Sequence, residues 1–179
     1  MSFDSARSDI IYQLFLLMHI TDALPEDHEA LTRLTKASKA YWGFDMEIME
    51  QWSDELTITQ TYIEEHFVYK LLVENILVGY YSYFEKESKL VKLDNLFIQP
   101  EYIRQGYGTL LMKDFLQRVS EKYNEVTLDA EPLSTDFYGN FGFKIVGQLP
   151  STIEGRFLQI MTKILKKKPG KNPASFNFI

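Results

Sequence analysis

Two glycines at the start of a predicted helix are the residues in this sequence best suited to chemistry. Gly106 and Gly108 follow an apolar, strand-like run that ends at Gln99-Pro100, and they open an amphipathic segment. Glycine lets the backbone adopt positive φ and approach a ligand closely, because no Cβ stands in the way. The first N–H groups of a helix lack intrahelical acceptors and lie at the positive end of its dipole, which favours phosphate. The pattern therefore predicts a site for a phosphorylated cofactor.

Other kinds of phosphate or metal site fit the sequence poorly. The dinucleotide fingerprint Gly-x-Gly-x-x-Gly belongs in a β-α-β unit, whereas the strand before Gly106 is predicted to belong to hairpins. The nucleoside-triphosphate loop requires Gly-Lys-Ser/Thr, which does not follow Gly108. The chain has no cysteine, which excludes thiolate nucleophiles, thiolate zinc sites and disulfides. Its three histidines are scattered without metal-ligand spacing, so no metal is predicted.

The elements that must position this turn are predicted from hydrophobic periodicity and turn residues. Strands are expected over residues 14–21, 67–73, 76–84, 89–98, 125–129, 143–148 and 157–165. Helices are expected over residues 25–39 (with Asp22 as a possible cap), 46–56, 107–123 and 134–140, and a short turn or helix over 59–66. Hairpins followed by one crossover and a closing hairpin predict an α/β protein of the α+β type. Its sheet would be mixed, mostly antiparallel and of about seven strands, with helices on both faces.

Composition indicates an ordinary soluble globular protein. The hydrophobic fraction is 45% and the charged fraction 25%, and the apolar run from Ile10 to Ile20 is too short to cross a bilayer. Five lysines and no acidic residue lie from Lys163 onward, so residues 1–162 carry a net charge of about −11. A body with this negative charge repels a phosphate backbone, which argues against nucleic acid as a partner. We expect one cytoplasmic domain over residues 1–179, with a core at about 14–165 and a basic, aromatic tail at 166–179.

Three motifs in a fixed order carry a family resemblance. They are Leu96-Phe97-Ile98-Gln99-Pro100, Arg104-Gln105-Gly106-Tyr107-Gly108-Thr109, and Phe137-Tyr138 with Gly142-Phe143. In this order and spacing they resemble the GNAT superfamily of acetyl-CoA-dependent N-acyltransferases. The resemblance implies a splayed parallel strand pair at the cofactor site. It also implies acetyl transfer from acetyl-CoA to a primary amine, by direct attack in a ternary complex and without a metal.

The same resemblance implies a role for each residue of the site. Cofactor binding would fall to backbone amides of the strand end and of the glycine turn, at Phe97, Ile98, Arg104, Gln105, Gly106, Tyr107, Gly108 and Thr109. Tyr138 matches the tyrosine that protonates the departing coenzyme A sulfur in many members. Asp94 matches a carboxylate that draws a proton from the acceptor amine in several members. Tyr41 and Trp42 fall where the family builds its acceptor pocket.

Structural roles are open for the same side chains. Tyr138 could be a core tyrosine packed on Phe143, Asp94 could be a solvated strand residue, and Tyr41 and Trp42 could be core aromatics. Weaker candidates for the acceptor site are Tyr62, Glu64, Glu65, Tyr80, Tyr81 and Tyr83.

Two other functions are also open. One is an enzyme of the same fold that uses another acyl-CoA or acylates an alcohol. The other is a non-catalytic module that senses coenzyme A or a metabolite. This second option depends on Ile103, where the family usually has Arg or Gln, and on Glu131, where Asn is common. It also depends on Asp94, whose role as a base is open. The expected partner is a small-molecule amine or peptide acceptor, without nucleic acid or membrane, and the resemblance leaves room for a homodimer.

Overall fold

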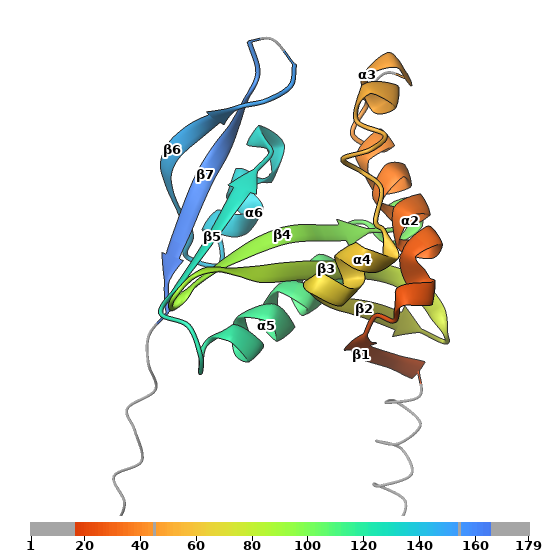
Figure 1. Ribbon diagram of the computed structural model, residues 1–179, viewed down its shortest axis with the longest axis horizontal. Helices are drawn as coiled ribbons and strands as arrows, with labels where there is room; N and C mark the ends of the chain where they lie inside the picture. Colours follow the sequence, from red (N-terminus) through yellow and green to blue (C-terminus); the bar gives the residue numbers. More distant parts are fainter. Residues whose placement is uncertain (1–16, 45, 154, 166–179) are drawn as a thin grey trace, which may run out of the picture. The chain divides into compact units, whose positions relative to one another are not determined.

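The computed structural model describes residues 17–44, 46–153 and 155–165, which form a mixed α/β protein (Figure 1). The strands are β1 Met18–Asp22, β2 Phe67–Val73, β3 Ile76–Glu87, β4 Leu90–Ile98, β5 Glu125–Ala130, β6 Lys144–Pro150 and β7 Phe157–Ile164. The α-helices are α2 His28–Ala40, α3 Met46–Gln51, α4 Gln60–Glu65, α5 Tyr107–Val119 and α6 Thr135–Gly139. Short 3₁₀ helices are η1 Pro25–Asp27, η2 Pro100–Tyr102 and η3 Pro132–Ser134.

The seven strands have the order β1-β2-β3-β4-β5-β7-β6, and all but one pair are antiparallel. The predicted fold class is therefore confirmed. Residues 14–16 of the first predicted strand and the tail at 166–179 lie outside the described residues.

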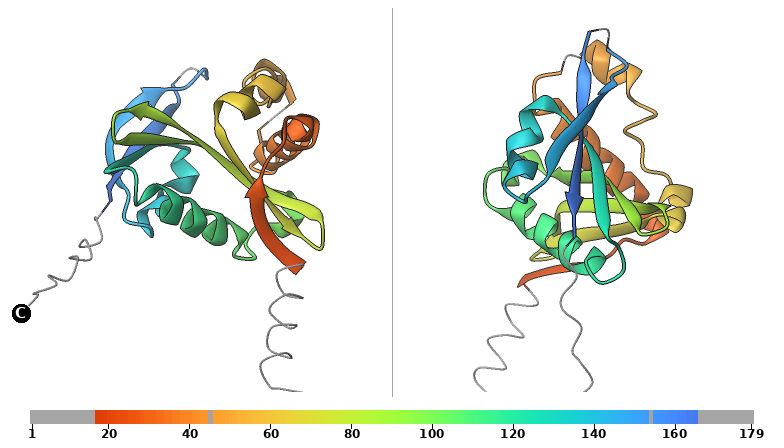
Figure 2. Two further views of the ribbon diagram at one scale, coloured as in Figure 1. Left: turned by 60° about the horizontal axis from the view of Figure 1, so that its bottom comes forward. Right: turned by 90° about the vertical axis from the view of Figure 1, so that its left-hand side faces the viewer.

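The chain folds as two compact units, and the first contains the predicted glycine turn. This unit comprises residues up to Phe84 together with Lys92–Phe115. Side chains alternate between the two faces of a strand. Tyr80 of β3 accordingly lies in a buried cluster with residues of α2 and α4, whereas the ring of its neighbour Tyr81 contacts Phe115 of α5. Helices therefore cover both faces of the first unit's strands, as predicted (Figure 2).

The end of β4 passes unusually close to β3 at Gly79. A Cβ on this residue would lie 2.6 Å from Ile98 Cδ1 and 2.7 Å from the Phe97 carbonyl oxygen. The Gln99 N–H also donates to the Val78 carbonyl over 2.8 Å. The absence of a side chain at Gly79 thus lets the last residues of β4 lie against β3, directly before the glycine turn.

The second unit comprises Glu85–Val91 and the residues from Leu116 onward. Its strands β5 and β6 both pair antiparallel with β7, for example Leu128 with Met161. The helices η3 and α6 connect β5 to β6.

The structure corrects several predicted boundaries. Asp22 is the last residue of β1 and not a helix cap. At the start of the helical segment, the Leu24 N–H donates to the carboxylate of Asp27 over 2.7 Å. The helix predicted over 46–56 is helical only to Gln51 and continues as turns. Strand β3 runs to Glu87, because the reversal into β4 is a tight turn with Lys89 at φ +69°. Helix α5 ends at Val119 rather than near 123.

Candidate active site

The predicted anion-binding turn is exposed and leads directly into a helix. Arg104 has φ +66° and Gly106 has φ +90°, and Gln105 between them does not share this left-handed conformation. Alternating backbone handedness aims successive N–H groups into one concavity, called a nest, that binds anions. Arg104 is a long side chain in a conformation that costs roughly 1–2 kcal/mol. The surrounding structure must therefore impose it.

Helix α5 adds further donors to this turn. Its first described intrahelical bond joins Leu110 N–H to the Gly106 carbonyl over 3.0 Å. The N–H groups of Tyr107, Gly108 and Thr109 therefore have no intrahelical acceptor. The helix behind them is held firmly, because Leu111 is completely buried. Nest and helix N-terminus together are a donor set that suits an anion such as a diphosphate.

The side chains at the strand end before the turn are packed within the first unit. The Phe97 ring packs 6.0 Å from the Tyr80 ring, and Ile98 is 9% exposed. Both side chains are thus used within the first unit. Contact of the cofactor with the main chain at Phe97 and Ile98, which the resemblance implies, stays a prediction.

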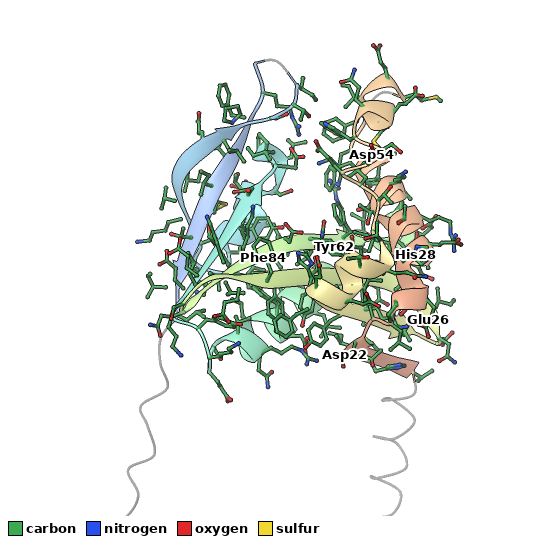
Figure 3. The ribbon with its side chains drawn as sticks, viewed as in Figure 1. Asp22, Glu26, His28, Asp54, Tyr62 and Phe84 are labelled. Carbon is green, nitrogen blue, oxygen red and sulfur yellow. The ribbon has the colours of Figure 1, made fainter. Side chains whose placement is uncertain are left out.

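Asp94 lies exposed on β4 and accepts a hydrogen bond from a tyrosine of α4. The Tyr62 hydroxyl donates to Asp94 Oδ2 over 2.5 Å (Tyr62 is labelled in Figure 3). Burial, followed by the neighbouring charge of Asp94, raises the pKa of Tyr62 well above its ordinary value. The Tyr62 hydroxyl therefore stays protonated and acts as a donor to the carboxylate.

Two further members of this cluster were not predicted from the sequence. The Tyr62 hydroxyl lies 2.7 Å from Ser82 Oγ and 2.7 Å from Asn95 Nδ2. Ser82 is completely buried and lies between the tyrosines of β3 in the sequence. A polar serine within this apolar run is the sequence feature from which its role could have been predicted. Tyr62, Ser82, Asn95 and Asp94 form one cluster of hydrogen-bonded side chains, named the Tyr62 cluster below.

The other acceptor candidates divide into exposed and buried residues. Tyr41 and Trp42 follow α2, are 50% and 45% exposed, and contact each other edge to face at 5.5 Å, so a core role for them is wrong. Tyr80, Tyr81 and Tyr83 are at most 6% exposed, and they are core residues rather than acceptor contacts. Glu64 and Glu65 are exposed at the end of α4.

Tyr138 belongs to the second unit and lies in an aromatic cluster. Its ring meets the Phe137 ring at 5.1 Å and the Phe143 ring at 6.0 Å, both nearly edge to face. The packing on Phe143, the structural alternative to a catalytic role, is therefore present. Burial raises the pKa of Tyr138 to about 12, so this hydroxyl remains a proton donor throughout the physiological range.

Glu131, which departs from the family pattern, has a structural partner. Its Oε2 forms a largely buried ion pair with Arg156 Nη2, and Arg156 Nη1 donates to Ser151 Oγ over 3.4 Å. These contacts attach the residue that follows β5 to the loop between β6 and β7. The charge at Glu131 is thus compensated inside the second unit.

The described residues contain neither a cluster of metal ligands nor a membrane-spanning helix. No group of three or more His, Asp or Glu residues in ranges 17–44, 46–153 and 155–165 is placed to hold a metal ion. In the same part of the chain, no helix has the length and apolar character needed to cross a membrane.

The fold and the glycine turn define the class of this protein. A mixed, mostly antiparallel sheet whose exposed turn opens a helix with free N–H groups is the arrangement expected of a GNAT-type acyltransferase. The family model described as the acetyltransferase (GNAT) domain matches residues 35–165. The chain therefore belongs to the GNAT acetyltransferase family.

Its individual relatives are distant. The uncharacterized N-acetyltransferase YafP of Escherichia coli is 28% identical over 98 residues, a match that spans 55% of this chain and 55%, about half, of that protein. The structure of PaiA N-acetyltransferase from Thermoplasma acidophilum, in complex with coenzyme A, aligns with a TM-score of 0.68 and 20% identity, covering 82% of this chain and 98% of that one. The ribosomal-protein-S18-alanine N-acetyltransferase from Escherichia coli aligns with a TM-score of 0.64 and 16% identity, covering 87% and 97%. At these identities the structural likeness shows the fold.

Proposed function

We propose that the protein is an acetyl-CoA-dependent N-acetyltransferase that moves acetyl to a primary amine. The observation that carries the proposal is the exposed nest at Arg104–Gly106 together with the unpaired N–H groups that begin α5. In a member of the GNAT family, these donors fit a coenzyme A diphosphate. The coenzyme A bound to the PaiA structure supports the same assignment. When bound, acetyl-CoA would supply an activated acetyl group as a thioester.

The acceptor amine must lose a proton before it can attack. An alkylammonium with a pKa of about 10.4 is neutral in only about one molecule in 2,500 at pH 7. This corresponds to a penalty of roughly 4.6 kcal/mol. A carboxylate near the amine can receive that proton, directly or through a water molecule. We assign this role to Asp94, the exposed carboxylate on the strand that leads to the glycine turn.

Direct attack in a ternary complex is the simplest route for the acyl group. The sequence contains no cysteine, and it has no Gly-x-Ser-x-Gly elbow to activate a serine. We assign Tyr138 the role of acid toward the departing sulfur, because its raised pKa keeps the hydroxyl protonated. A thiolate leaving group has a pKa of about 8.5 by analogy with cysteine and needs only modest help.

The acceptor is proposed to be a small-molecule amine or a peptide, bound near Tyr41 and Trp42. Their exposed rings offer contact area beside the C-terminal end of α2. The proposal includes action in the cytoplasm and allows a homodimer.

Calorimetry and thiol release test the proposal in two steps. The purified protein is first titrated with acetyl-CoA, and it is then incubated with acetyl-CoA and a panel of primary amines while free thiol is measured. We expect saturable binding and thiol release that depends on an amine. Absence of binding at millimolar acetyl-CoA would refute the proposal. Binding without turnover on any amine, alcohol or peptide would favour a coenzyme A sensor, and release from longer acyl-CoA alone would favour another acyltransferase.

A further inference from the structure

We propose that Tyr62 is a positioning residue that holds the Asp94 carboxylate in place for the acceptor amine. The inference rests on the proposed function and extends it to a residue of α4. It is carried by the directions of the hydrogen bonds in the Tyr62 cluster.

A count of hydrogens fixes these directions. The Tyr62 hydroxyl has one proton, which it donates to Asp94 Oδ2. Its oxygen must then accept from both other neighbours, Ser82 Oγ and Asn95 Nδ2. Ser82 in turn accepts from Asn95 over 2.9 Å. Every bond therefore runs toward the carboxylate, and such chains strengthen one another.

The same count makes Tyr62 the principal donor to Asp94. The amide of Asn95 has two hydrogens but three neighbouring acceptors, at 2.7 Å, 2.9 Å and 3.3 Å. The longest of these contacts is the one to Asp94 Oδ2. Within the described part of the chain, the Asp94 carboxylate has no hydrogen-bond partner besides Tyr62 and Asn95. Removal of the Tyr62 hydroxyl would thus leave the carboxylate held only by the longer contact from Asn95.

Packing around Tyr62 makes it a stable anchor. Its ring stacks on His66 at 4.0 Å with an interplanar angle of 10°, and His66 Nδ1 lies 2.9 Å from the Tyr62 carbonyl oxygen. The Thr59 hydroxyl caps α4 by accepting from Tyr62 N–H over 3.0 Å. Ser82, the residue that supports the hydroxyl from β3, is completely buried. The tyrosine is therefore fixed at its backbone, its ring and its hydroxyl.

The two oxygens of the Asp94 carboxylate differ in their contacts, and this difference suits a proton acceptor. Tyr62 and Asn95 both bind Oδ2, which leaves Oδ1 for an ammonium group. A carboxylate held by one oxygen presents the other in a fixed direction, and such fixation preserves the geometry that proton transfer requires.

The test compares Tyr62→Phe with a matched control, Tyr123→Phe. The Tyr123 hydroxyl also donates to a carboxylate, Glu85 Oε2 over 3.0 Å, but in the second unit. With acetyl-CoA and the most active amine of the panel, kcat of Tyr62→Phe should fall about tenfold or more, because a hydrogen bond to a charged group is lost. Binding of acetyl-CoA by calorimetry should not change. Tyr123→Phe should keep the wild-type kcat.

A double mutant separates positioning from general stability. In an Asp94→Asn background, addition of Tyr62→Phe should cause no further loss of kcat, whereas a merely structural role would give losses that multiply. Ser82→Ala, a smaller change that removes one support of Tyr62, should lower kcat less and should also be silent in the Asp94→Asn background. It provides the test if Tyr62→Phe does not fold.

The outcomes distinguish this inference from the proposed function. Wild-type kcat in Tyr62→Phe, or multiplying losses in either double mutant, would overturn the role of Tyr62 and leave the acetyltransferase intact. A wild-type protein without turnover on any amine would overturn both.

Discussion

Replacement of Gly106 by alanine separates the strain of the glycine turn from its use as an anion site. At φ +90° a Cβ is strained by the backbone alone, since no atom lies within 4 Å of the position it would take. The expected cost is about 1–2 kcal/mol of folding free energy. For a chain of this size that lowers the melting temperature by about 2–8 °C.

The same substitution should weaken cofactor binding far more than this strain suggests. A backbone shift that removes one N–H bond to a charged phosphate costs about 1.5–3 kcal/mol, or about tenfold to 100-fold in the Kd of acetyl-CoA. Gly155 provides the matched control, because it also has positive φ, +75°, and open space around its Cβ position. Gly155→Ala should lose similar stability and keep the wild-type Kd.

Calorimetry with acetyl-CoA and thermal unfolding measure the two effects side by side. If Gly106→Ala melts at a lower temperature but binds acetyl-CoA as tightly as wild type, the turn is not the anion site. Equal weakening by Gly155→Ala would refute the reasoning in another way, because a general loss of stability would then explain both.

Three further predictions concern the acid and the strand that precedes the turn. Tyr138→Phe should lower kcat by about 10²-fold and leave the Kd of acetyl-CoA unchanged. This loss is at the low end for a general acid, because transfer of a proton from a group of pKa about 12 to a thiolate is uphill. An unchanged kcat would show that Tyr138 takes no part in the chemistry. Since burial raises this pKa, the acid form persists as pH rises through 10, so kcat of the wild type should show no alkaline fall from Tyr138 below about pH 11. Gly79→Ala should lower the free energy of unfolding, measured in urea, by about 1–3 kcal/mol, because its Cβ clashes with Phe97 and Ile98. Gly147→Ala is the control and should not lower it, because its Cβ would make an ordinary 3.6 Å contact. Equal losses of unfolding free energy would contradict the close approach of β4 to Gly79.

Local patterns in the sequence predicted the elements that surround the site. The strand predicted over 67–73 is β2 without change, because its apolar residues are bounded by turn residues at Glu74-Asn75, which both adopt positive φ. The amphipathic helix predicted from residue 107 is α5, and Leu111 and Phe115, four residues apart on its apolar face, are both completely buried. Hydrophobic periodicity and turn residues are patterns of a few neighbouring residues, so they can be recognised in the sequence without knowledge of the fold.

Contacts between distant residues could not be read in the same way. Tyr62 and Asp94 are 32 residues apart, and only the fold brings the hydroxyl to the carboxylate. Glu85 lies one residue beyond the strand predicted over 76–84, but it continues β3. It binds the side chains of Lys122 and Tyr123, whose hydrogen bonds lower its pKa. The ion pair of Glu131 with Arg156 likewise joins residues that are 25 positions apart.

A crystal structure of the protein with acetyl-CoA is the most direct test of the central claim. The account predicts diphosphate oxygens within about 3.2 Å of backbone nitrogens in the segment from Arg104 to Thr109. A diphosphate bound elsewhere, or held there by side chains while those N–H groups face solvent, would contradict it.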